Sequence, residues 1–226
     1  MTDVQNNLQS VLKNIPQNVK LVAVSKFHPA QSVIEAIEAG QNLFGENRVQ
    51  EAAQKFDEIR AKGYQPELHI IGSLQRNKVK EAVRIASMIE SVDRTELLDE
   101  IEKQCAKIGK TIQILFEIHT GEESKSGFES REALEAALKN FEKGMYPHIQ
   151  IKGFMTMAPL TQDEALIRKS FKTLKNLQSQ IQKEYPAYDF GELSMGMSGD
   201  YKIAIEEGST MVRIGTAIFG ARDYSK

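Results

Sequence analysis

Eight short apolar runs alternate with longer amphipathic stretches along the chain, and this alternation is the strongest constraint on its fold. Short apolar runs that stop at turn residues are typical of buried strands, whereas apolar residues spaced by three or four positions are typical of helices. The predicted strands are Leu21–Ser25, Asn42–Phe44, Leu68–Ile71, Met88–Ser91, Ile112–Ile118, Ile151–Thr156, Glu192–Ser194 and Met211–Ile214.

Helical patterns occupy the segments between the predicted strands, and one more precedes the first strand. The predicted helices are residues 4–14, Pro29–Ala39, Arg48–Lys62, Gln75–Ile85, Arg94–Ile108, Ser130–Lys143, Gln162–Glu184, Asp200–Glu207 and a short one from about Thr216.

Capping residues support several of these helix boundaries. Asp93 is the predicted N-cap of the helix at Arg94–Ile108, and Ser198 is the predicted N-cap of the helix at Asp200–Glu207. Glycine follows five of the helices, where a residue with a left-handed backbone often ends a helix. These glycines are Gly40, Gly63, Gly109, Gly144 and Gly208.

Strict alternation of strand and helix predicts parallel strands that are joined by right-handed crossovers. Eight such units favour a single α/β domain over residues 1–226, folded as a (β/α)₈ TIM barrel with an extra N-terminal helix. A doubly wound open sheet is the alternative. No GxGxxG motif follows the first strand, which weakens the case for a dinucleotide-binding fold.

Composition excludes several classes of function. The 29 basic and 31 acidic residues nearly balance, so no electrostatic argument favours a nucleic-acid or membrane partner. No apolar stretch is long enough to span a membrane, and the polar first residues do not resemble a signal peptide. The single cysteine, Cys105, cannot form an intramolecular disulfide, and the four histidines lack zinc-ligand spacing. We therefore expect a cytoplasmic protein without a metal site.

Lys26 follows the first predicted strand directly, and His28-Pro29 comes just after it. Desolvation at a strand end lowers the pKa of a lysine, and an amine with a lowered pKa forms Schiff bases with carbonyl compounds. The structural alternative is a lysine whose charged end reaches solvent. In a (β/α)₈ barrel the chemistry lies at the carboxyl ends of the strands, which favours a functional role for Lys26.

The loops after the last two predicted strands resemble a phosphate cradle. Ser198 and Gly199 precede one helix, and Gly215 and Thr216 begin the next. Amide groups at a helix start bind anions, and barrels often bind phosphate with the loops after strands seven and eight. Ordinary helix capping is the alternative for each loop.

Arg213 lies within the last predicted strand, one residue before Ile214. A guanidinium group stays charged and only donates hydrogen bonds. Beside a pyridine nitrogen it would leave that nitrogen unprotonated, which makes the ring a weak electron sink. An ion pair with a carboxylate such as Glu192 is the alternative.

These residues lie in segments that closely resemble the YggS/PROSC family of pyridoxal-phosphate homeostasis proteins. The match runs in order through most of the chain. The matching segments are Ala23-Val24-Ser25-Lys26, Phe44-Gly45-Glu46-Asn47, His69-Ile70-Ile71-Gly72, Leu74-Gln75, Asn77-Lys78, Ser124-Lys125-Ser126-Gly127, Gly153-Phe154-Met155-Thr156-Met157, Leu193-Ser194-Met195-Gly196-Met197-Ser198, Val212-Arg213-Ile214-Gly215-Thr216 and Phe219-Gly220.

The resemblance implies a barrel like the N-terminal domain of alanine racemase, with pyridoxal 5′-phosphate (PLP) bound as a Schiff base on Lys26. By this likeness Arg213 faces the pyridine nitrogen and Asn47 lines the ring pocket. The phosphate would be held by Ser198, Gly215 and Thr216, with a backbone contact at Gly199. The chain departs from the family pattern at His119-Thr120-Gly121, where relatives usually carry an Asn-rich segment.

The expected function is storage, buffering or delivery of PLP without robust catalysis, by a monomer whose partners are PLP and PLP-dependent apoenzymes. No catalytic residue is assigned, because the chain ends at Lys226 without the second domain that supplies a base in alanine racemase. Three alternatives stay open. One is a racemase-like enzyme with His69 or Tyr201 as its acid or base, although His69 is more typical of a barrel interior. The others are a Schiff-base aldolase and an interaction module. Lys125 is a second candidate amine.

Overall fold

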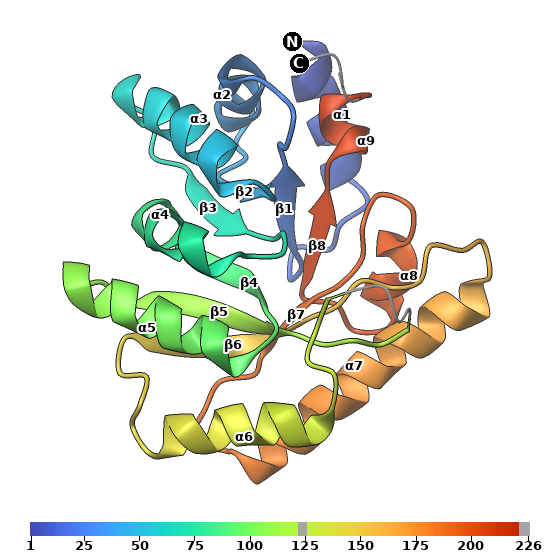
Figure 1. Cartoon of the computed structure of the whole chain (residues 1–226). Helices are drawn as coiled ribbons and strands as arrows, with labels where there is room; N and C mark the ends of the chain where they lie inside the picture. Colours follow the sequence, from blue (N-terminus) through green and yellow to red (C-terminus); the bar gives the residue numbers. More distant parts are fainter. Residues whose placement is uncertain (122–125, 222–226) are drawn as a thin grey trace.

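Eight parallel strands close into a barrel in chain order, so that β1 pairs with both β2 and β8. This computed structural model describes residues 1–121 and 126–221, and it confirms the predicted (β/α)₈ TIM barrel (Figure 1). The strands are β1 Lys20–Val24, β2 Leu43–Glu46, β3 Glu67–Ile70, β4 Met88–Val92, β5 Ile112–Glu117, β6 Ile149–Met155, β7 Glu192–Ser194 and β8 Met211–Ile214.

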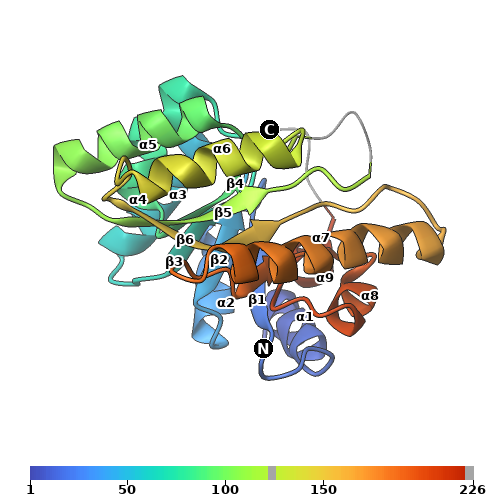
Figure 2. The same ribbon diagram turned by 90° about the horizontal axis from the view of Figure 1, so that it is seen from below.

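Helices surround the strands, as two views of the ribbon at right angles show (Figures 1 and 2). The segment predicted as one helix over Gln75–Ile85 consists of a 3₁₀ turn, Arg76–Lys78, followed by α4. The α-helices are α1 Asp3–Leu12, α2 Ala30–Glu38, α3 Val49–Ala61, α4 Val79–Ile85, α5 Thr95–Ile108, α6 Arg131–Glu142, α7 Glu164–Glu184, α8 Tyr201–Glu206 and α9 Thr216–Phe219.

Apolar side chains form two separate layers. The larger layer lies between strands and helices, where for example Phe44 of β2 meets Phe56 of α3 edge to face with ring centroids 6.2 Å apart. Met88, Leu115 and Met155 form a small second cluster. Because side chains alternate along a strand, this cluster occupies the barrel interior. Polar groups fill other interior positions, and they matter for the site.

The predicted glycine positions are confirmed, since all five adopt positive φ, from 62° at Gly109 to 97° at Gly40. The two predicted N-caps are wrong. The cap of α5 is Arg94, whereas the Asp93 carboxylate binds the Arg94 guanidinium. The cap of α8 is Asp200, whose side chain accepts from the Met197 amide at 2.6 Å. Both loops turn one or two residues later than the sequence suggested.

The predicted extra helix is α1, which begins with a capping box between Thr2 and Gln5. It packs beside α9, where the Asn7 side-chain amide donates to the Ile218 carbonyl at 3.2 Å. The first and last helices therefore lie side by side next to β1 and β8 (Figure 1).

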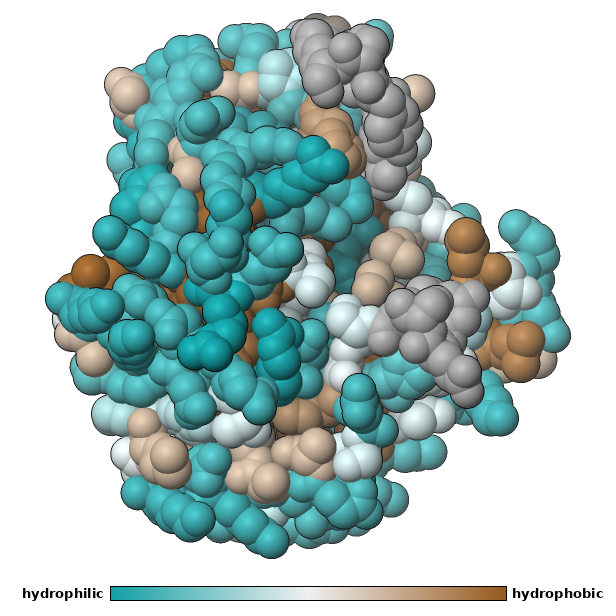
Figure 3. All heavy atoms as spheres, in the orientation of Figure 1, coloured by the Kyte–Doolittle hydropathy of each residue, from teal (hydrophilic) through white to brown (hydrophobic). Residues whose placement is uncertain are grey.

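The face seen in Figure 3 is mostly hydrophilic, with apolar surface at the edge where the chain enters α7. Leu160 and Leu166 are large apolar side chains that are exposed in this part of the chain, and Met197, in the loop after β7, is exposed as well. Within residues 1–121 and 126–221, no helix is long and apolar enough to cross a membrane.

Candidate functional site

The carboxyl ends of β2, β1, β8 and β7 are consecutive neighbours at one end of the barrel. Ala23 of β1 is in register with Phe44 of β2 on one side and with Ile214 of β8 on the other. Asn47, Lys26 and the Gly215-Thr216 pair each follow one of these strands, so they emerge at the same end. The Arg213 amide of β8 donates to the Gly196 carbonyl at 2.9 Å, which joins the loop after β7 to this group.

Lys26 occupies a tight turn at the end of β1. The turn is closed by the His28 amide, which donates to the Ser25 carbonyl at 3.1 Å. Phe27 has φ of 66°, a left-handed conformation that costs a non-glycine residue about 1–2 kcal/mol. Two contacts offset this cost. The Arg48 guanidinium lies over the Phe27 ring, 5.0 Å from its centroid, and His28 stacks on Phe219 with ring centroids 5.2 Å apart. The turn is therefore held in place from both sides.

A buried polar cluster holds the same turn from below. The Lys55 ammonium donates to the Ser25 carbonyl at 2.8 Å and to the Glu46 carboxylate at 2.7 Å, and the Ser25 hydroxyl donates to the same carboxylate at 2.8 Å. Burial raises the pKa of Glu46, while Lys55 and Ser25 act in the opposite direction. This cluster ties the backbone next to Lys26 to β2 and α3.

Asn47 presents a buried side-chain oxygen that has no hydrogen-bond partner among the described residues. Gly72 lies so close behind it that an added Cβ would be 2.8 Å from the Asn47 backbone. An unsatisfied buried polar atom costs about 1–3 kcal/mol. Its position beside Lys26 fits a residue that lines a polar ring.

The loop after β7 fits a phosphate in two respects. The amides of Ser198 and Gly199 donate to no oxygen within the described ranges, and an added Cβ on Gly199 would meet no atom within 4 Å. Gly215, in contrast, packs tightly, since its added Cβ would lie 3.0 Å from the Val24 carbonyl oxygen. Free amides beside open space suit an anion, and the close packing of Gly215 brings the start of α9 against β1.

Arg213 is 4% exposed and does not pair with Glu192. Glu192 instead binds Lys20 at the other end of the barrel. The Arg213 guanidinium donates to the Ser194 hydroxyl at 2.7 Å and to the Thr156 carbonyl at 2.9 Å. Burial lowers the pKa of Arg213 below its ordinary value, and nearby Glu90 opposes that change. Arg213 thus stays a cationic donor directly below the mouth.

His69 lies in the barrel interior, as its sequence position suggested, and is 2% exposed. Its Nδ1 is 2.7 Å from Glu90 Oε1, and its Nε2 is 3.6 Å from Glu67 Oε1. Burial disfavours the charged ring, but the interactions with Glu67 and Glu90 outweigh it and raise the pKa of His69 to about 9. Glu90 and Ser194 were not identified from the sequence, although polar residues inside apolar strands are a usable signal.

We expect stability to fall in alkaline solution because His69 loses its proton there. A folded-state pKa near 9 against 6.5 unfolded gives stability that is complete below pH 6.5 and is lost as the pH rises through 9. The free energy of unfolding should drop by on the order of 3 kcal/mol between pH 6.5 and 10. Urea unfolding at several pH values measures it.

His69→Gln should flatten this pH dependence, whereas His148→Gln, which replaces a half-exposed histidine paired with Glu102, should leave it intact. Other charged groups act electrostatically on one another around His69, namely Glu67, Glu90, Arg213 and Lys20. An equally steep alkaline loss in His69→Gln would assign the dependence to other groups.

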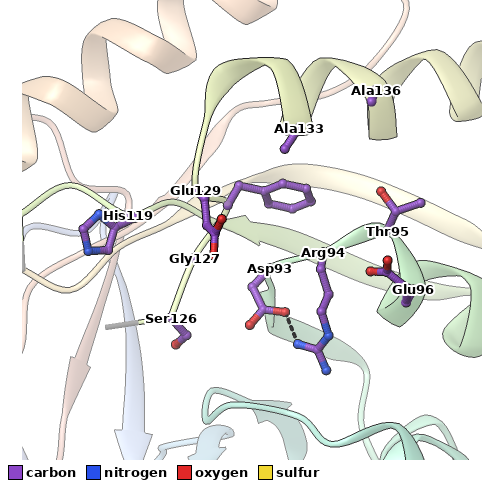
Figure 4. Close-up of a pocket in the computed structure, with 11 residues that line it drawn as sticks. Asp93, Arg94, Thr95, Glu96, His119, Ser126, Gly127, Glu129, Ala133 and Ala136 are labelled. Atoms are coloured by element: carbon purple, nitrogen blue, oxygen red, sulfur yellow. Dashed lines mark hydrogen bonds and ion pairs between the residues drawn. The ribbon is translucent and has the colours of Figure 1, made fainter. Parts of the chain in front are cut away.

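A separate cavity of about 630 Å³ opens on the β4 and β5 side of the barrel (Figure 4). Its lining includes Asp93, Arg94, Glu129 and two residues of the β5 loop, His119 and Ser126. Lys125, the second candidate amine, lies outside the described residues. No group of three or more potential metal-ligating side chains gathers in residues 1–121 and 126–221.

Comparison with known proteins places the chain in a family. Residues 1–223 match the model of the alanine racemase N-terminal domain. The pyridoxal phosphate homeostasis protein of Pasteurella multocida is 38% identical over 232 aligned positions, which cover 100% of this chain and 97% of the relative. That of Escherichia coli K12 is 37% identical, with complete coverage of both chains. The chain belongs to the pyridoxal phosphate homeostasis protein family.

Solved structures of this family and of more distant proteins share the fold. PipY of Synechococcus elongatus, solved with PLP bound, is 34% identical with a TM-score of 0.89, over 96% of this chain and 100% of PipY. Alanine racemase of Bacillus anthracis has a TM-score of 0.75 at 19% identity, and the match covers 99% of this chain and 57% of the racemase. The second likeness concerns the fold alone.

Proposed function

We propose that this protein binds PLP at the mouth formed by β2, β1, β8 and β7, as a Schiff base on Lys26, and acts in intracellular PLP homeostasis. It would store, buffer or deliver PLP in the cytoplasm as a monomer, with PLP-dependent apoenzymes as recipients. One observation carries the proposal: four neighbouring strand ends bring Asn47, Lys26, Gly215-Thr216 and the Ser198 loop together above a buried Arg213. The PLP-bound relative PipY supports the choice of ligand.

Each residue of the site has a distinct role in this proposal. The Lys26 amine would condense with the aldehyde of PLP and release water. Ser198 and Thr216 would donate hydroxyl hydrogen bonds to the phosphate, and Gly199 and Gly215 would contribute through their backbones. Asn47 would contact the ring with the side-chain oxygen that lacks a described partner.

Arg213 argues for binding rather than turnover. When bound, PLP supplies an electrophilic aldehyde and a pyridine ring that accepts electrons. A guanidinium donor facing the ring nitrogen keeps that nitrogen unprotonated, because both groups cannot hold the same hydrogen-bond position as donors. The ring then stabilises negative charge poorly. The names of the relatives, which describe homeostasis rather than a reaction, agree with this assignment.

A racemase-like enzyme is the alternative, since the matching family model is named after alanine racemase. It needs an acid or base with access to the ligand. His69 is a poor candidate, because it is buried and engaged by Glu90. Tyr201 is the remaining candidate for the acid or base. It begins α8 and packs closely on Gly196, where an added Cβ would lie 2.9 Å from the Tyr201 Cα.

Amino-acid turnover separates the two functions. We expect the PLP-loaded protein, incubated with L- and D-amino acids in deuterated water, to exchange α-protons no faster than free PLP does. NMR and chiral chromatography follow exchange and racemisation, with free PLP and the Lys26→Ala protein as controls. Racemisation in the usual enzyme range of about 1–10³ s⁻¹ would replace the carrier function by the enzyme.

A further inference from the structure

Arg213 is a buried cation whose charge is balanced by a group that it does not touch directly. No carboxylate lies within ion-pair distance of it in the part of the chain that the structure describes. Its two terminal guanidinium nitrogens donate to neutral oxygens, the Ser194 hydroxyl and the Thr156 carbonyl. A buried ion needs compensation, so the source of the negative charge must lie one group further away.

Glu90 of β4 contributes most to that charge and acts through Ser194, while Glu117 and Asp200 contribute less. The Ser194 hydroxyl is 2.5 Å from Glu90 Oε2. Because the guanidinium can only donate, the Ser194 hydroxyl must accept from Arg213 and donate its own hydrogen bond to the Glu90 carboxylate. The direction of both hydrogen bonds is therefore fixed, and Arg213, Ser194 and Glu90 form one chain of donors and acceptors across the barrel.

His69 fixes the other side of the carboxylate. Its Nδ1 is 2.7 Å from Glu90 Oε1, so both oxygens of Glu90 have partners. Glu90 and Ser194 are both fully buried. A connected buried network of this kind holds its members in one orientation, and removing one member leaves the others without partners.

We infer that Glu90 is a positioning residue for Arg213: through Ser194 it sets the guanidinium plane and supplies the counter-charge that keeps this donor aimed at the ligand's ring nitrogen. This inference rests on the proposed PLP site. The site then extends from the mouth to the centre of the barrel, and β4 joins the strands that shape it.

The side-chain Nη–H signals of Arg213 in the ligand-free protein test the coupling directly. A buried, hydrogen-bonded guanidinium exchanges its protons slowly with water, and NMR resolves it. Glu90→Gln and Ser194→Ala should each speed this exchange by about tenfold or more, because Ser194→Ala removes a hydrogen bond of the guanidinium and Glu90→Gln removes the negative charge that orients Ser194 toward it. Glu192→Gln is the matched control, since Glu192 lies on β7 but pairs with Lys20, and it should change nothing.

PLP binding supplies the second readout. Both variants should raise the Kd for PLP by about tenfold, and the double variant should lose no more than either single one, because the two residues act in series. With ¹⁵N-labelled PLP, the ring-nitrogen signal should move toward the protonated value in both variants. A merely structural role would not move that signal.

Circular dichroism identifies variants that fail to fold, and Ser194→Ala, the smaller change, keeps the test valid if Glu90→Gln does not fold. Unchanged Arg213 exchange and an unchanged ring-nitrogen signal in a folded variant would overturn the inference. If the wild-type protein does not bind PLP, the proposed function fails, while the ligand-free exchange measurement still decides whether Glu90 holds Arg213.

Discussion

Lys26→Ala should abolish covalent PLP binding. The purified variant should be colourless, and borohydride reduction followed by peptide mass mapping should find no pyridoxyl label on any of its lysines. The physical reason is placement: Lys26 lies in a closed turn after β1, at the same end of the barrel as Asn47, Gly215 and the loops proposed to bind the phosphate. We expect the affinity for PLP to fall at least a thousandfold. Without the covalent bond, only the noncovalent contacts remain, roughly two or three hydrogen bonds.

Lys20→Ala is the matched control, since Lys20 begins the same strand at the opposite end of the barrel. That variant should retain colour and label. A pyridoxyl label found chiefly on another lysine of the wild-type protein, such as Lys125, would refute the assignment of Lys26.

Removing the hydroxyls of Ser198 and Thr216 should weaken PLP but hardly affect pyridoxal, which lacks the phosphate. A hydrogen bond to a charged group contributes about 1.5–3 kcal/mol, so each Ala variant should lose about tenfold to a hundredfold in affinity and the double variant about a hundredfold or more. Titrations of both vitamers, followed by absorbance, measure the effect.

Ser130→Ala is the control for this experiment, because Ser130 caps α6 and lies in neither of the two loops. It should bind both vitamers like the wild type. Equal losses of PLP and pyridoxal in the Ser198 and Thr216 variants would argue against a phosphate contact at these residues.

Local pattern was sufficient to predict the barrel but not its details. Each strand that the structure contains overlaps a predicted one, because strand and helix periods differ and glycine marks the helix ends. Boundaries were less accurate: β2 extends to Glu46, whereas the prediction stopped at Phe44. Gly45 and Glu46 read as a turn in the sequence, and pairing with β1 and β3 keeps them extended.

The site could be predicted in part. Lys26, Asn47 and Gly215 follow strands, and barrel topology alone brings such residues to one end. The support for Arg213 could not be predicted, because Glu90 and Ser194 are separated by 104 positions and meet only when the barrel closes. The Ser198 cap was wrong for a related reason. A cap depends on the backbone path of its loop, and Asp200 takes that position here.

The pairing of β1 with β8 has a consequence for synthesis of the chain. β1 ends at Val24 and β8 begins at Met211, so at about 5–20 residues per second a ribosome needs roughly ten to forty seconds to make the partner that covers this edge. Until then β1 exposes unpaired backbone, which other nascent chains can join. Lys26 is made early, yet the phosphate loops proposed here come last. A nascent chain would therefore contain Lys26 long before it could bind the phosphate of PLP. PLP would stabilise only the closed barrel.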